Sequence, residues 1–62
     1  MQGIKARYIQ TMDFTFENVI IVNCDNESTL ENKIKYGEVL KILNENEIEY
    51  INSQYVMYYK LQ

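Results

Sequence analysis

Residues 28–46, with the sequence STLENKIKYGEVLKILNEN, decide the predicted fold. Ser28 and Glu31 have the three-residue spacing of a capping box, which marks the start of a helix. Four apolar side chains then recur at the spacing of one helical stripe: Tyr36, Val39, Leu40 and Leu43. We therefore predict one helix over residues 28–46. Two shorter helices that meet at Gly37 are the alternative, because a glycine inside a helix costs about 1 kcal/mol relative to alanine.

Strand patterns lie on both sides of this helix. Before it, residues 4–12 and 14–24 alternate or run apolar and are typical of an antiparallel hairpin. After it, residues 47–50 alternate again, and residues 55–61 are rich in residue types that favour strands. The chain is thus predicted to be a single small α+β domain, 1–62. In this domain a small antiparallel β-sheet, in ββαββ order, is covered on one face by a single helix.

The same patterns predict which side chains form the core. One set is expected to face inward: Ile4, Ala6, Tyr8, Val19, Ile21, Val39, Leu40, Leu43, Tyr55, Met57, Tyr59 and Leu61. The other face of the sheet is then left to water or to a partner.

The composition argues against several classes of function. The 62-residue chain has one cysteine and no histidine, so it can form no internal disulfide and lacks the usual ligands of a zinc site. Cys24 has no imidazole to activate it, and we interpret it as a small packed residue. We accordingly predict that the protein is not an enzyme and uses no catalytic residue, metal, cofactor or small-molecule substrate.

Charge and hydropathy narrow the choice of partner. Six Lys and Arg against nine Asp and Glu give a net charge of −3, which disfavours nucleic acid as a general partner. The longest apolar run, residues 19–22, is far shorter than the roughly 20 residues that cross a membrane. The lone thiol suits a reducing cytoplasm. The abundance of Ile, Asn, Lys, Glu and Tyr suggests an A/T-rich bacterial or phage genome.

The C-terminal segment is the part that suggests a function, because four of the six tyrosines lie within residues 50–59. Tyrosine is enriched where proteins bind proteins, and a small domain without disulfides or metals can gain stability by docking on a partner. We predict a non-enzymatic protein-binding module, a small regulator or inhibitor of phage or mobile-element type that docks on a larger protein. A second copy of the chain is another candidate partner. The predicted contact residues are Tyr58, Val56, Tyr50, Glu47 and Glu49.

The alternative function depends on how the first and last strands are placed. If they are neighbours in the sheet, their outward side chains form a basic patch that includes an aromatic ring: Lys5, Arg7, Tyr58 and Lys60. Sheets that bind single-stranded nucleic acid combine stacking rings with cations in this way.

Overall fold

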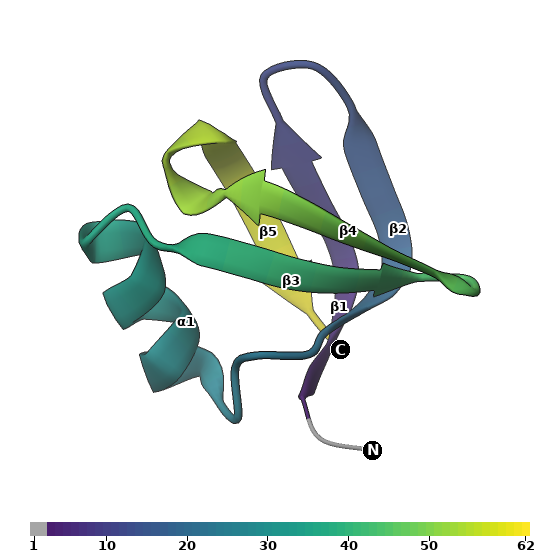
Figure 1. The fold of residues 1–62 in the computed structure, drawn as a ribbon, viewed down its shortest axis with the longest axis horizontal. Coiled ribbons are helices and arrows are strands. Elements are labelled where there is room, and N and C mark those ends of the chain that lie inside the picture. The colour runs from purple at the N-terminus through teal and green to yellow at the C-terminus, as the bar shows by residue number, and fades with distance from the viewer. Residues whose placement is uncertain (1–2) are drawn as a thin grey trace.

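The computed structural model describes residues 3–62, which form one α-helix and a five-stranded antiparallel sheet (Figure 1). In chain order the elements are β1 (Ile4–Thr11), β2 (Thr15–Ile21), α1 (Glu27–Lys35), β3 (Val39–Asn44), β4 (Glu47–Asn52), the 3₁₀ turn η1 (Ser53–Tyr55) and β5 (Val56–Leu61). The predicted α+β class is confirmed. The observed order differs from the predicted ββαββ order by one additional strand, β3, which directly follows the helix.

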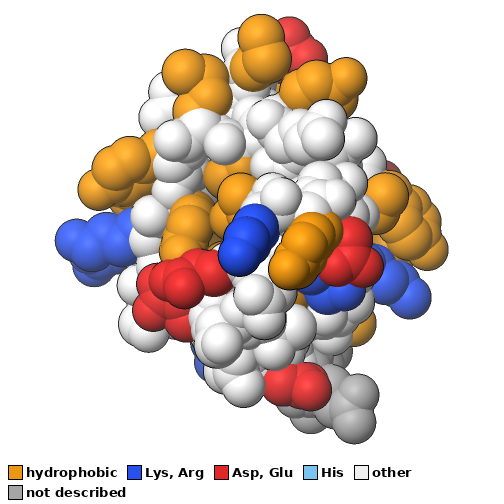
Figure 2. Space-filling view, turned by 90° about the vertical axis from the view of Figure 1, so that its left-hand side faces the viewer, with side chains coloured by type: hydrophobic (Ala, Val, Ile, Leu, Met, Phe, Trp, Pro, Cys, Tyr) orange, Lys and Arg blue, Asp and Glu red, His pale blue; other side chains and the backbone are white. Residues whose placement is uncertain are grey.

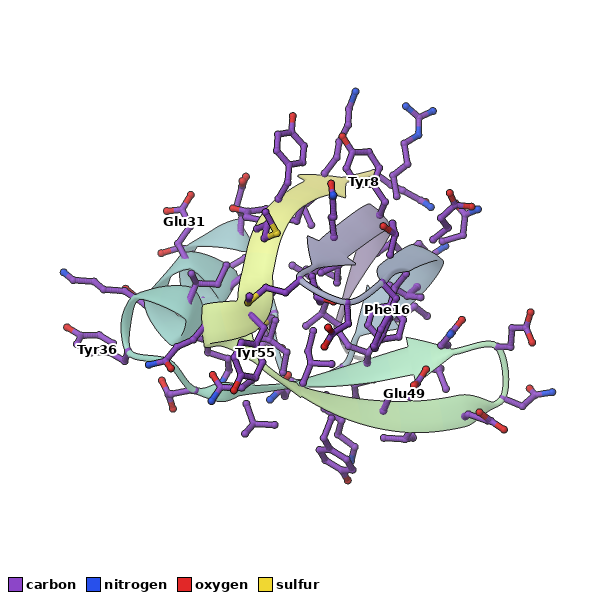
Figure 3. All side chains as sticks on the ribbon, turned by 90° about the horizontal axis from the view of Figure 1, so that it is seen from above. Tyr8, Phe16, Glu31, Tyr36, Glu49 and Tyr55 are labelled. Atoms are coloured by element: carbon purple, nitrogen blue, oxygen red, sulfur yellow. The ribbon has the colours of Figure 1, made fainter. Side chains whose placement is uncertain are left out.

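The strand order in the sheet is β4-β3-β2-β1-β5, so β4 and β5 are its two edges. The last strand returns to pair with the first, with Ile9 opposite Tyr59. The arrangement that the alternative function requires is therefore present. The β3–β4 hairpin runs across β1, β2 and β5 in Figure 1, and the view from above separates the two groups of strands into layers (Figure 3).

Side chains fill the space between these layers (Figure 3). Nine of them form the buried core: Ala6, Ile9, Phe16, Val19, Ile21, Cys24, Leu30, Leu40 and Ile42. The helix contributes Leu30 and packs Ile34 beside the core. The helix lies beside β5 (Figure 1), where its Glu27 accepts a hydrogen bond from Tyr59, while the β3–β4 hairpin adds Leu40 and Ile42 to the core.

The helix is half as long as predicted. It begins after Asn26 rather than at a cap on Ser28, because the Asn26 carboxamide oxygen accepts a 2.9 Å hydrogen bond from the Thr29 amide. It ends at Lys35, and Gly37 follows in the left-handed region with φ +66°. A left-handed residue of this kind closes a helix, and glycine adopts it without a steric penalty. The single helix over residues 28–46 and the pair of shorter helices are thus both wrong beyond Gly37.

The segment that follows Gly37 is strand β3. Its alternation places Leu40 and Ile42 in the core, whereas Val39 is exposed and Leu43 is half-buried. The predicted inward placement of Val39 and Leu43 is therefore wrong: Leu43 pairs with Ile20, on the side of the sheet that carries Lys5. A tight turn at Glu45, which has φ +58°, leads directly into β4.

The inward set also needs correction in the outer strands. The pairing of β1 with β5 is irregular between Ala6 and Tyr8, and beyond this point Ile9 rather than Tyr8 enters the core. At the other end, η1 occupies the residues before β5. Tyr55 and Met57 are consequently exposed, although they were predicted to face inward.

Candidate functional site

Three exposed rings surround a shallow groove of about 170 Å³ at the end of the molecule formed by the β1–β2 turn and η1. The groove, called the aromatic groove below, is lined by Thr11, Asp13, Phe14, Tyr50, Ile51, Asn52 and Tyr55. The exposed fractions are 50% for Phe14, 67% for Tyr50 and 55% for Tyr55. Figure 2 shows hydrophobic side chains gathered at this end, with an acidic side chain beside them. Large apolar rings exposed together are typical of an interaction surface.

The first ring of the groove is held by the turn between β1 and β2. The buried Thr11 hydroxyl donates to the Phe14 carbonyl at 2.9 Å and accepts from the Phe14 amide at 3.2 Å. Phe14 then packs edge-on against Phe16, with ring centroids 4.8 Å apart and planes at 77°. Since Phe16 belongs to the core, the Phe14 ring is anchored on one side and open on the other.

The ring of Tyr55 is positioned by η1. The Asn52 side-chain oxygen caps this turn by accepting a 2.9 Å hydrogen bond from the Gln54 amide. Ser53 is fully buried, and its amide donates to the Glu38 carbonyl at 3.1 Å. These bonds fix the backbone on both sides of the groove wall, so Tyr55 projects from a rigid turn.

The predicted protein contacts do not form one surface. Tyr50 lines the aromatic groove, but Tyr58 lies on β5, at the opposite edge of the sheet. Val56 is half-buried and packs against the core, so the prediction that its side chain faces away from the core is wrong. The β-strand phase that follows η1 turns Val56 inward and leaves Met57 and Tyr58 outside.

The two predicted carboxylates lie on β4. Glu47 is exposed at its start, whereas Glu49 is half-buried and accepts a 3.1 Å hydrogen bond from the Asn44 carboxamide. Neither lines the aromatic groove. The carboxylate that does so is Asp13, in the β1–β2 turn.

The residues of the alternative function do share a face. Lys5 and Arg7 are exposed on β1, and Tyr58 and Lys60 are exposed on the neighbouring β5.

A wider hollow of about 520 Å³ lies along β5 beside α1. The Tyr59 hydroxyl, on its floor, donates a 3.2 Å hydrogen bond to the Glu27 carboxylate, which links β5 to the helix. Burial is the main cause that raises the pKa of Tyr59, and this hydrogen bond adds to it. The ring of Tyr59 also packs on the core. The hollow is therefore mainly the seam along which the helix attaches to the sheet.

The chemistry-bearing side chains of the described residues are few. Cys24 is fully buried, which confirms that it is a packed residue, and burial raises the pKa of its thiol. Within residues 3–62 no three carboxylate or thiol side chains converge as metal ligands would.

Comparison with known proteins adds no further assignment: no protein family, curated protein or solved structure matches the chain. In the part of the chain that the structure describes, no helix has the length and apolar character needed to cross a membrane.

Proposed function

We propose that this protein is a non-enzymatic protein-binding module, a small regulator or inhibitor whose aromatic groove holds a segment of a larger protein. The observation that carries the proposal is the cluster of Phe14, Tyr50 and Tyr55, each at least half exposed around one groove. Such rings combine a large apolar surface with few rotatable bonds, so they bind at a low cost in entropy. A cytoplasmic location, in which the Cys24 thiol stays reduced, belongs to the same proposal.

The dimensions of the groove favour a peptide over a small molecule. Small-molecule sites are usually enclosed and measure about 300–1,000 Å³, whereas this groove is open and measures about 170 Å³. Grooves lined by aromatic rings suit extended, proline-containing segments, because these segments are already ordered before they bind. Asp13 at the rim would favour a Lys or Arg in the segment.

Selection from a display library of random dodecamer peptides on the full chain tests this proposal. We expect enriched peptides that share an apolar or proline-containing core and a basic residue. Tyr50→Ala and Tyr55→Ala should each weaken a selected peptide by roughly 5-fold or more, because tyrosine is among the residues that carry most of the binding energy in an interface.

Tyr36→Ala is the matched control for this experiment. Tyr36 is 69% exposed, but it lies at the end of α1 and does not line the groove. The control should bind the selected peptide as the unchanged chain does. Failure to enrich any peptide, or equal weakening by Tyr36→Ala, would exclude the groove as the docking site. Sedimentation equilibrium of the unchanged chain and the same variants tests whether a second copy of the chain occupies the groove. In that case the unchanged chain self-associates, and Tyr55→Ala alone loses this self-association.

A further inference from the structure

The outer side of β1 and β5 carries rings and cations that the aromatic groove does not use. Pairing of these strands places Tyr8 directly opposite Lys60. Figure 3 shows Tyr8 projecting from the side of the sheet that faces away from the β3–β4 hairpin. We call the outward residues of these two strands the β1–β5 face: Lys5, Arg7, Tyr8, Tyr58 and Lys60.

The two tyrosines of this face are stacked on each other. The rings of Tyr8 and Tyr58 lie nearly parallel, with an angle of 14° between their planes and 5.6 Å between centroids. Tyr58 is 56% exposed, so much of its surface is open to a third ring. Desolvation is the main cause that raises the pKa of Tyr8, and the neighbouring Tyr58 adds to the shift. An open ring stack is a ready surface for a planar aromatic ligand.

The charge of the β1–β5 face is opposite to that of the whole chain. It carries three of the six cationic residues, and two carboxylates lie beside them: Glu17, opposite Tyr8 on β2, and Glu27, which lines the hollow next to Tyr58 and Lys60. Three positive charges against two give this region +1, so a chain of net charge −3 carries −4 elsewhere. Opposite charges separated in this way create a local field that attracts anions.

We propose that the β1–β5 face binds single-stranded nucleic acid, with bases stacked on its two rings and phosphates beside its three cations. Single strands are favoured over duplexes because their bases are free to stack on exposed rings, whereas base faces in a duplex are already covered. The net charge of −3 further weakens long-range attraction to the denser charge of a duplex. This site is separate from the aromatic groove and does not depend on the function proposed for it.

Fluorescence anisotropy with a labelled dodecamer of deoxythymidine and the full chain tests the proposal. Binding at 50 mM salt should weaken with added salt, with a slope of about −2 in log affinity against log salt concentration, as three phosphate contacts predict. Tyr58→Ala should weaken binding roughly 5- to 150-fold and leave the slope unchanged, because it removes stacking but no charge. Lys60→Gln should reduce the magnitude of the slope by about 0.7.

Lys35→Gln supplies a charge-matched control, since Lys35 is exposed in the last turn of α1. It removes the same charge as Lys60→Gln but should leave the slope unchanged. Equal effects of the two substitutions would show attraction by overall charge and overturn the proposal. Absence of binding at 50 mM salt would do so as well. A third result would also overturn the proposal: the chain binds no oligonucleotide, and Tyr58→Ala loses the binding of a protein or peptide. The β1–β5 face would then be a protein interface.

Discussion

The hydroxyl of Ser53 donates a 2.8 Å hydrogen bond to the main-chain carbonyl of Lys33, and this contact joins η1 to the last turn of α1. The same carbonyl accepts a 2.9 Å hydrogen bond from the Glu38 amide. Ser53 lies two residues before Tyr55, so the bond that secures the end of the helix also secures one wall of the aromatic groove. Groove and helix are therefore expected to lose order together.

Ser53→Ala should lower the free energy of unfolding by about 1 kcal/mol, because a buried hydrogen bond is lost while the Lys33 carbonyl keeps one donor. Ser53→Val should cost more, since an extra methyl group must enter a filled site. Urea denaturation at pH 7 measures both. Ser28→Ala, at an exposed position in α1, is the control and should change stability by less than about 0.5 kcal/mol. Equal losses at the two serines would contradict the role given to Ser53.

Gly37→Ala should destabilise the protein by about 1–2 kcal/mol, because a left-handed conformation is unfavourable for residues with a Cβ atom. An added Cβ atom would also lie 2.5 Å from the side-chain nitrogen of Gln54. A double-mutant cycle with Gln54→Ala separates the two causes. The double variant should lose less stability than the sum of the single ones. A neutral Gly37→Ala would rule out the left-handed end of the helix.

Periodicity was enough to predict the other strands of the sheet, but it could not decide whether residues 39–44 form a helix or a strand. Leu40 and Leu43 fit the stripe of a helix that includes Tyr36, whereas Leu40 and Ile42 fit the alternation of a strand. Short apolar runs of this kind satisfy both periods. Pairing with β4 selects the strand, and such pairing depends on residues that are distant from any local window. Gly37 was the local signal that a helix could not continue.

Substitutions at Ile42 and Leu43 test whether residues 39–44 form a strand, which buries Ile42, or continue the helix, which would bury Leu43. Ile42→Ala should cost about 2–4 kcal/mol because Ile42 is fully buried between the layers. Leu43→Ala should cost clearly less, since Leu43 is half-buried on the other side of β3. Urea denaturation measures the free energy of unfolding of both variants, and the comparison uses one common value for its dependence on urea concentration. The opposite order of losses would support the helical stripe, in which Leu43 faces the core.

The candidate sites were predictable only in part, for a similar reason. The exposed Lys5, Arg7, Tyr58 and Lys60 follow from alternation once β1 and β5 are paired. The aromatic groove does not, because Tyr55 belongs to a 3₁₀ turn that interrupts the alternation before β5. Rings that are distant in sequence meet there only after the β3–β4 hairpin crosses the other strands.

Alkaline pH should destabilise the protein through Cys24 and Tyr59. In the folded state burial raises the pKa of both groups, so each holds its proton more tightly than in the unfolded chain. The stability that these two groups contribute is therefore complete at a pH below their pKa in the unfolded chain. It is lost as the pH rises through their pKa in the folded protein. Urea midpoints should be constant from pH 6 to 8 and fall above about pH 9. Tyr59→Phe keeps the ring but has no proton to lose, so its midpoint should fall less steeply above about pH 10. An unchanged alkaline slope in Tyr59→Phe would show that the hydrogen bond to Glu27 does not link this proton to folding.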